Sequence, residues 1–336
     1  MIPVLDYSAV EEAAAKEEKS ALLLGNGFAI ALDSGFSYGG LFDSAKKAMS
    51  ERVLRVFAQA GGTDFEAALR LLDDGRWVAS QYWEEVDDSN LQGDHEAIRN
   101  ALVEAVRVCH VASTVDLEDR KKAQAVAFLA SYRTVFTTNY DLLLYWVAMH
   151  MGEERRLDDG FRGPPDKLTF DGWRKPRQML HLHGALHFYR ANGGLRKLSS
   201  AGGGTPLKKL IGDGIEAGQY PHFVSEGSHT AKLAKIYGSR YLHDCYRRLE
   251  VVGPTLVTLG FSFADNDAHL STAVFNSPNL RTVFVGLHGD AKSAGNRGIV
   301  TRVTRALESR GKKLDEVDVQ YFDSRSAHIW VAPGAK

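Results

Sequence analysis

The chain has 336 residues, 44% of them hydrophobic and 25% charged, which is enough for one large α/β domain with insertions or for two domains. Its 41 basic and 42 acidic residues nearly balance, which argues against a protein that coats nucleic acid or anionic membrane. Two cysteines, Cys109 and Cys245, are too few for a disulfide framework or a four-cysteine zinc site. Neither an export signal nor a run of about 18 apolar residues is evident, so we expect a cytoplasmic protein without a membrane span.

The predicted elements of the first half are mostly helical. An Ala/Glu/Lys-rich helix over residues 8–20 precedes a strand over residues 21–24. A glycine-rich segment with aromatic residues, 34–42, could lie over a bound ligand. Residues 43–130 repeat apolar positions at i, i+3 and i+4, so we predict a helical insertion between the first two core strands, with packing as its expected role.

In the second half, strands alternate with helices. We predict strands over residues 134–138, 179–182, 255–259, 282–285, 317–322 and 328–331, and helices over residues 142–149 and 300–308. Residues 158–176 are predicted to form a polar loop, and residues 185–250 a second insertion that ends in one long helix over 230–250. This alternation predicts a Rossmann-like α/β fold, a doubly wound parallel sheet, in a single domain spanning residues 1–336.

Three of the predicted strands end in glycine, asparagine, aspartate or histidine. The three ends read Gly25-Asn26-Gly27, Thr137-Thr138-Asn139-Tyr140-Asp141 and His181-Leu182-His183-Gly184. Ligands of open parallel sheets bind in the crevice outside the carboxyl ends of the strands. We therefore predict that the three ends line a single pocket.

The first two ends suit a nucleotide, although each also fits a simpler role. Glycines at a strand-to-helix turn let the backbone approach a diphosphate, but Ile30 stands where the dinucleotide fingerprint has its third glycine, so a tight turn alone is an alternative. The amide of Asn139 can orient a water, and the carboxylate of Asp141 can accept a hydrogen bond from a carboxamide. Either residue could instead cap the helix that begins at Leu142.

The third end offers a base. An unperturbed imidazole titrates at about 6.5, so His183 can accept a proton at cellular pH. Strand periodicity would also let His181 and His183, with His187, face a metal ion, but no Asp, Glu or Cys cluster completes that set. A core position is the other interpretation of His181.

In order and content, these turns resemble the sirtuin superfamily. Gly25 and Gly27 match its GxGxS turn, with Ala29 in place of the serine, and residues 137–141 match Thr-Gln-Asn-Ile-Asp, with Thr138 in place of the glutamine. His183 and Gly184 match the sirtuin His-Gly pair. After the 255–259 strand, Gly260-Phe261-Ser262 resembles the Gly-Thr-Ser turn, and the segment 221–228 resembles a bacterial sirtuin-like family.

The resemblance implies a site for NAD+ as substrate. It assigns Asn139 and His183 as catalytic residues, with His183 as general base. It assigns contacts with the dinucleotide to Gly25, Asn26, Gly27, Phe28, Thr138, Asp141, Gly260 and Ser262. Protein-deacylating sirtuins carry a four-cysteine zinc module; because this chain has two isolated cysteines, we expect no zinc or other metal, and water rather than a peptide as acceptor.

The activity implied is that of an NAD+ hydrolase, which releases nicotinamide and ADP-ribose. Bacterial sirtuin-like domains of this kind resemble antiviral defence effectors, so we expect a homo-oligomeric or partner-gated state. A non-catalytic sensor of NAD or an ADP-ribose derivative, and a protein ADP-ribosyltransferase, are the alternatives. A dehydrogenase is disfavoured because the third glycine and an acidic ribose-binding residue at the expected spacing are both missing.

Overall fold

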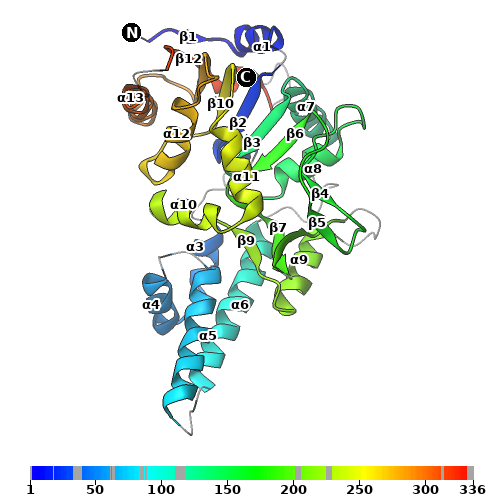
Figure 1. Cartoon of the computed structure of the whole chain (residues 1–336), viewed down its shortest axis with the longest axis vertical. Helices are drawn as coiled ribbons and strands as arrows, with labels where there is room; N and C mark the ends of the chain where they lie inside the picture. Colours follow the sequence, from blue (N-terminus) through cyan, green and yellow to red (C-terminus); the bar gives the residue numbers. More distant parts are fainter. Residues whose placement is uncertain are drawn as a thin grey trace.

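The structure is a computed structural model that describes residues 2–17, 19–32, 40–60, 62, 65–83, 87, 89–109, 118–191, 193–200, 206–224, 229–311 and 314–330. Within this part of the chain, seven strands form one parallel sheet (Figure 1). From one edge to the other they are β1 (Val4–Leu5), β12 (Asp318–Asp323), β11 (Thr282–Leu287), β10 (Thr255–Leu259), β2 (Ala21–Leu24), β3 (Thr134–Thr137) and β6 (Gln178–His181).

The strand order confirms the predicted doubly wound fold. If β1 is left out and the other six strands of this sheet are numbered by their order along the chain, the sheet read from β6 to β12 has the strand order 3-2-1-4-5-6. This is the order of dinucleotide-binding Rossmann folds. The order reverses between β2 and β10, which pair in parallel with Leu24 opposite Leu259. A crevice at the carboxyl ends of these two strands is where such a fold binds its ligand.

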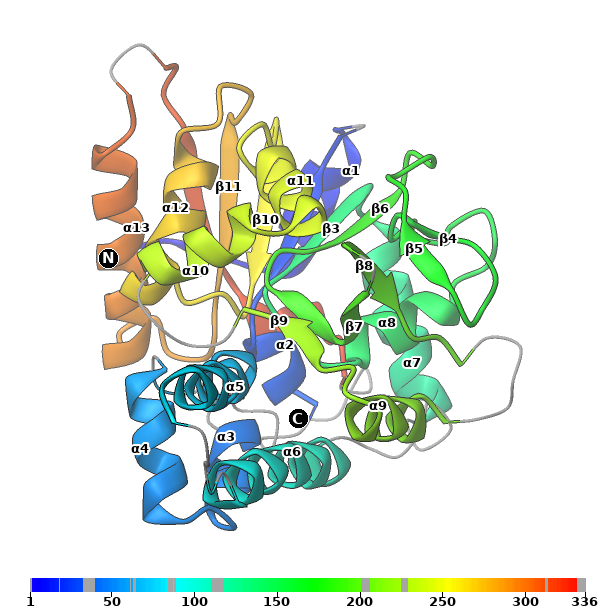
Figure 2. The same ribbon diagram turned by 60° about the horizontal axis from the view of Figure 1, so that its bottom comes forward.

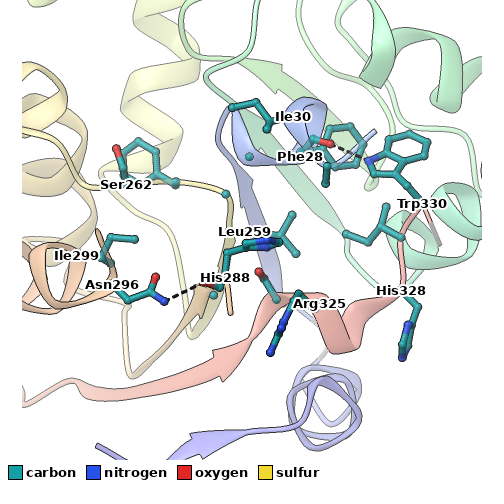
Figure 3. Close-up of a pocket in the computed structure, with 17 residues that line it drawn as sticks. Phe28, Ile30, Leu259, Ser262, His288, Asn296, Ile299, Arg325, His328 and Trp330 are labelled. Atoms are coloured by element: carbon teal, nitrogen blue, oxygen red, sulfur yellow. Dashed lines mark hydrogen bonds between the residues drawn. The ribbon is translucent and has the colours of Figure 1, made fainter. Parts of the chain in front are cut away.

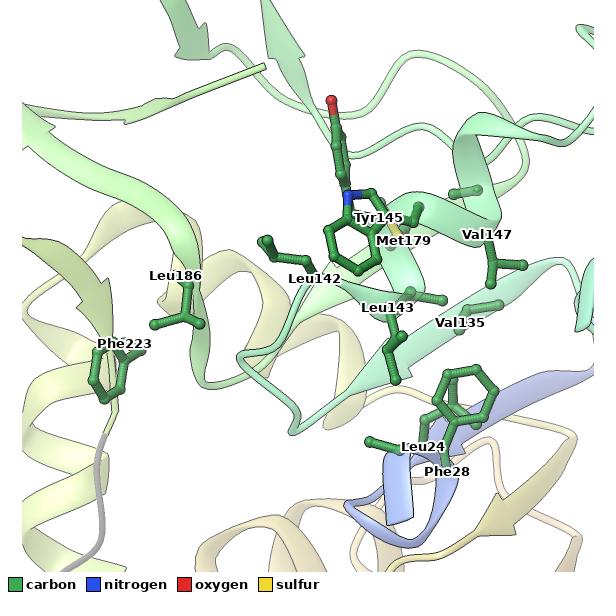
Figure 4. Packing of buried hydrophobic residues seen from close by; sticks show 14 of the residues in the cluster. Leu24, Phe28, Val135, Leu142, Leu143, Tyr145, Val147, Met179, Leu186 and Phe223 are labelled. Carbon is green, nitrogen blue, oxygen red and sulfur yellow. The ribbon is translucent and has the colours of Figure 1, made fainter. Parts of the chain in front are cut away.

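Helices cover both faces of the sheet. Strand β2 is buried on both sides, because Leu22 and Leu24 pack into one core and Leu23 into the other. The first core takes in α1 (Tyr7–Ala15), α7 (Asp119–Ala130) and α8 (Leu143–Met149), and Figure 4 shows part of it around Leu24, Val135 and Leu143. The second takes in α11 (Arg240–Leu249), α12 (Ala268–Phe275) and α13 (Ala294–Glu308).

Between β2 and β3 the described chain is helical, as the apolar periodicity predicts. It forms α2 (Gly27–Ile30), α3 (Gly40–Lys46), α4 (Glu51–Gln59), α5 (Phe65–Tyr82), α6 (Ser89–Cys109) and α7. Helices α5 and α6 lie side by side and project away from the sheet (Figures 1 and 2). Most of the glycine-rich segment 34–42, expected to cover a ligand, lies outside the described residues.

A second sheet is the main departure from the sequence prediction. It is antiparallel, in the order β4 (Phe161–Arg162), β5 (Leu168–Phe170), β8 (Gly194–Lys197), β7 (Gly184–Ala191) and β9 (Pro221–Phe223). The predicted polar loop 158–176 therefore contains two strands. They were missed because two- and three-residue strands carry no periodicity, and because β5 pairs with the distant strand β8, with Leu168 opposite Lys197. Helix α9 (Leu207–Glu216) follows β8.

Two further predictions are wrong. The single helix over residues 230–250 is two helices, α10 (His229–Tyr237) and α11, because Gly238 ends the first and Ser239 is extended (φ −131°, ψ 119°). Residues 328–330 are not a strand: a 3-10 helix, η4 (Ser324–Ala327), precedes them, and His328 has a φ of 46°. None of the described helices is both long and apolar enough to cross a bilayer.

Candidate functional site

Two turns meet at the point where the strand order reverses. The N–H of Gly25 donates to the carbonyl of Leu259 (2.9 Å), and the N–H of Gly27 donates to the carbonyl of Gly260 (3.0 Å). A Cβ on Gly25 would lie 2.4 Å from the Gly260 oxygen, and one on Gly27 would lie 2.6 Å from the Gly260 Cα. Gly260 itself has a φ of 67°. All three glycines are thus required for the backbones of the turns to pack together.

A cavity of about 540 Å³ opens beside these turns (Figure 3). Four of the predicted ligand contacts line it: Gly27, Phe28, Gly260 and Ser262. Gly25 and Asn26 do not line the cavity. Asn26 is the N-cap residue of α2. The volume is within the range of small-molecule pockets, about 300 to 1,000 Å³. The structure therefore places a ligand-sized cavity at the crossover of the sheet.

The rest of the lining comes from the last third of the chain. These residues were not predicted as ligand contacts; only Gly286, which follows the predicted 282–285 strand, lies at a predicted strand end. The Asn296 amide near the start of α13 donates to the carbonyls of His288 (2.9 Å) and Asp290 (2.8 Å). The indole N–H of Trp330 donates to the Phe28 carbonyl (2.7 Å), and the two rings lie 5.0 Å apart. The incorrect strand prediction over 328–331 concealed Trp330, whereas the Ser293 cap followed by Asn296 was a usable signal.

A second group of predicted residues follows β3. The N–H of Thr138 donates to the Leu24 carbonyl (3.0 Å), which ties this turn to the end of β2. The carboxylate of Asp141 accepts from the N–H of Leu143 (2.8 Å), the first residue of α8, although the N-cap position itself is Leu142. Burial raises the pKa of Asp141 to about 6, although the N–H of Leu143 and the neighbouring amide of Asn139 oppose the rise. Asn139 is itself buried.

The third strand end lies against the second. The N–H of Leu182 donates to the Thr137 carbonyl (2.8 Å), and the N–H of Leu186 donates to the Tyr140 carbonyl (2.8 Å). Backbone hydrogen bonds therefore join the end of β2 to the turn after β3, the end of β3 to the turn after β6, and the turn after β3 to β7. The three predicted strand ends are brought side by side, but Asn139, Asp141 and His183 are each buried, and none of them lines the 540 Å³ cavity.

His183 has a partner that the sequence pattern did not reveal. Its Nε2 atom lies 3.3 Å from Nε2 of His269, with the two rings stacked. Asp267 Oδ1 is 3.9 Å from the same His183 atom and 2.7 Å from the ammonium of Lys232 on α10. Burial lowers the pKa of His183 to about 3, and the charge of Lys232 adds to the shift. Burial likewise lowers the pKa of His269 to about 3.

This cluster bears on the possibility of a metal site. Possible ligand atoms of His183, Asp267 and His269 all lie within 4.8 Å of one another, so of the histidine set His181, His183 and His187 only His183 belongs to this cluster. The Lys232 ammonium, however, already supplies the carboxylate with a cation at 2.7 Å. His181, by contrast, is fully buried, in agreement with the core interpretation.

The segment from Gly260 to His269 joins the two groups. Its first residues line the cavity at the crossover, and its last residue contacts His183. The guanidinium of Arg302 on α13 donates to the Ser262 carbonyl from Nε (3.0 Å) and Nη2 (2.9 Å), which fixes the middle of this segment. A single connection after β10 therefore leads from the 540 Å³ cavity to a buried imidazole pair.

Comparison with solved structures finds similarity to a protein titled as the crystal structure of a Sir2 homolog–NAD complex. The TM-score is 0.41 and the sequence identity 11%, over 92% of this chain and 97% of that chain. Comparison with curated protein sequences gives no match. One family model, described as "Domain of unknown function (DUF4917)", matches residues 22–330, and the chain therefore belongs to that family.

Proposed function

We propose that the protein binds NAD+ across the sheet crossover and hydrolyses the bond between nicotinamide and ribose. The observation that carries this proposal is the Gly260–His269 connection, which leads from a cavity for one half of a dinucleotide to the His183 group. The doubly wound order places both at the carboxyl ends of the strands, where such folds bind dinucleotides. In this arrangement the adenosine half occupies the 540 Å³ cavity, and the nicotinamide ribose lies near Asn139.

The buried group suits a reaction through a positively charged sugar. Loss of neutral nicotinamide leaves an oxocarbenium-like ribose, to which water adds to give ADP-ribose and a proton. The amide of Asn139 can orient that water, and the carboxyl of Asp141 can hold the nicotinamide carboxamide. A proton on the oxygen of the adduct is strongly acidic, so neutral His183 needs only weak basicity to accept it. Its low pKa keeps it neutral at cellular pH.

The burial of Asn139 and His183 favours a second candidate function, that of a non-catalytic sensor. Asn139 and His183 are each 3% exposed, so the site must open before a dinucleotide reaches them. A protein that only senses NAD or an ADP-ribose derivative in the crossover cavity would not need that opening. The same burial supports control of the hydrolase by an oligomer or a partner, as expected of a defence effector that depletes NAD+.

Product analysis tests the proposal. Purified wild type, Asn139→Ala, His183→Ala and, as a matched control, the exposed His150→Ala are incubated with NAD+, and nicotinamide and ADP-ribose are followed by chromatography. We expect release by wild type and by His150→Ala, and loss of at least about 100-fold in the other two variants. Label from NAD+ that stays on protein would identify a transferase. NAD+ binding without any release would favour the sensor.

A further inference from the structure

A second cavity, of about 600 Å³, lies apart from the crossover. It is bounded by α8, by the loops before β4 and before β6, and by β4, β5 and β8 of the antiparallel sheet. None of its lining residues lines the crossover cavity. Neither the sequence motifs nor the proposed hydrolysis uses it.

One wall of this cavity is apolar. Met149 of α8, Leu157 and Met179 contribute to it together with the ring of Tyr145. Figure 4 shows Tyr145 and Met179 near each other, with the Tyr145 hydroxyl pointing away from Leu143. That hydroxyl shares a hydrogen bond with Ser199 Oγ (3.0 Å). The wall can therefore receive a flat apolar body, with polar atoms at one end.

The lining carries more basic than acidic residues. Five basic residues from four separate segments converge on the cavity, against two acidic ones: Arg156, Arg162, Arg174, Lys175 and Lys197 face Asp158 and Asp159. Both carboxylates are already engaged within the protein. Asp159 pairs with Lys197, and Asp158 accepts from Arg162 (2.6 Å) and from the backbone N–H groups of Gly160, Arg174 and Lys175 (2.7–3.0 Å).

The remaining positive charge is at the rim. Arg156, Arg174 and Lys175 are exposed, and the Arg174 guanidinium pairs with Asp171, which does not line the cavity. The hydrogen bonds to Asp158 fix the loop that carries Arg174 and Lys175 beside the loop that carries Arg156. The cations are thus gathered by the fold, unlike a run of charges on one solvated helix face.

We propose that this cavity binds a small phosphorylated ligand with an aromatic body, of mononucleotide size. Arginine presents a planar fork of donors that matches a phosphate, and lysine adds a point charge. The apolar wall formed by Tyr145, Met149 and Met179 receives the ring. Phosphate alone lacks the apolar contact, and a nucleoside alone lacks the charge, so affinity requires both parts in one molecule.

A ligand in this cavity would also affect the candidate functional site, because helix α8 contacts both. Tyr145 and Met149 belong to α8, whose first residue, Leu143, donates its N–H to Asp141. The Tyr145 ring also lies 4.7 Å from that of His187 on β7. This regulatory consequence rests on the proposed hydrolysis, whereas the binding does not.

The test uses the full chain without NAD+ and adenosine 5′-monophosphate as the probe, titrated by calorimetry. Wild type is compared with Arg156→Glu/Lys175→Glu and with Lys16→Glu/Arg247→Glu, a matched charge reversal at exposed positions outside both cavities. We expect the first double variant to bind at least about tenfold more weakly, the control to bind as wild type, and adenosine or inorganic phosphate to bind poorly. Melting temperatures confirm that both variants fold.

A labelling experiment locates the site independently. Pyridoxal 5′-phosphate, itself an aromatic phosphate, forms imines with lysines that borohydride traps for peptide mapping. We expect Lys175 to be labelled in preference to the exposed Lys16, and the probe nucleotide to protect it. Probe binding that survives the Arg156/Lys175 reversal, absence of binding to wild type at millimolar concentration, or equal labelling of the two lysines would each overturn the proposal.

Discussion

The Nε2 atoms of His183 and His269 lie 3.3 Å apart, although one residue follows β6 and the other follows β10, three strands away in the sheet. A hydrogen bond between these atoms needs one imidazole to donate and the other to accept, and burial lowers the pKa of both rings, which keeps both neutral at cellular pH. The pair therefore fixes the orientation of His183 from the opposite half of the sheet. His269 is a positioning residue for the proposed base, and Asp267 and Lys232 lie next to the pair.

Replacing His269 by asparagine is expected to raise the pKa of His183. The smaller side chain admits water, so the burial that lowers the His183 pKa to about 3 is relieved and the value moves toward its usual range. Because hydrolysis needs neutral His183, the rate at pH 5 relative to pH 7.5 should fall about tenfold in His269→Asn and stay nearly constant in wild type. A pH–rate profile measures this, and the exposed His150→Asn is the control.

The histidine titration can also be followed without the reaction. Proton resonances of the His183 ring, recorded against pH in the free protein, should shift at higher pH in His269→Asn than in wild type. If the two titrations coincide, His269 does not shield His183, even if both proteins hydrolyse NAD+. If neither protein hydrolyses NAD+ but the resonances behave as expected, only the proposed function is wrong.

Acid should destabilise the fold through its buried histidines. The folded-state pKa values of His181, His183 and His269 are lowered to about 4, 3 and 3, mainly by burial, so on acidification the unfolded chain binds protons first. Stability is therefore lost as pH falls below about 6.5, by up to about 1.4 kcal/mol per pH unit for each histidine. Asp141 opposes this, because its raised pKa lets the folded state bind a proton as pH falls through 6.

Urea unfolding at pH 7.5 and pH 5.5 measures the net effect. We expect the free energy of unfolding to fall by about 2 to 4 kcal/mol between these values. His181→Leu removes one buried imidazole that lines neither cavity, so the pH dependence of this variant should be shallower by about 1 kcal/mol over the same interval. A free energy that does not change with pH would show that these imidazoles are not buried neutral groups.

The sequence predicted those parts of the fold that depend on local patterns. The run Ala21 to Leu24 is apolar at every position and ends at a glycine, so a buried parallel strand with a turn was recognisable. His269 was not recognisable as a partner of His183, because only the order of the strands brings the two together. The partner of Asp267 was equally hidden, because Asp267 pairs with Lys232, which lies in the second insertion. Contacts across the sheet carry no local signal.

Removal of one partner of the Lys232–Asp267 ion pair is expected to destabilise the protein, mainly because the other charge stays buried without a partner. The two side chains are only 6% and 13% exposed. Lys232→Met leaves a buried carboxylate without its cation, which typically costs about 3 to 5 kcal/mol of stability. The double variant Lys232→Met/Asp267→Asn removes both charges and should recover most of that loss. Urea unfolding of wild type, Lys232→Met, Asp267→Asn and the double variant forms a double-mutant cycle that gives the coupling energy between the two side chains. Additive losses of stability would mean that the pair does not interact.

Glycine is required most strictly at the crossover of the sheet. In Gly260→Ala the new Cβ would lie 2.6 Å from the Gly27 Cα, at a φ of 67° that disfavours any residue with a Cβ. Neither backbone can retreat, because the Gly27 N–H donates to the Gly260 carbonyl. We expect a loss of about 3 kcal/mol or more, or failure to fold. Gly75→Ala is the matched control: it lies within α5, where no atom of the described residues comes within 4 Å of the new Cβ, and it should stabilise the protein by up to about 1 kcal/mol. Thermal unfolding of the two variants decides between a packed crossover and a loose one, since equal melting temperatures would contradict the close approach of the two turns.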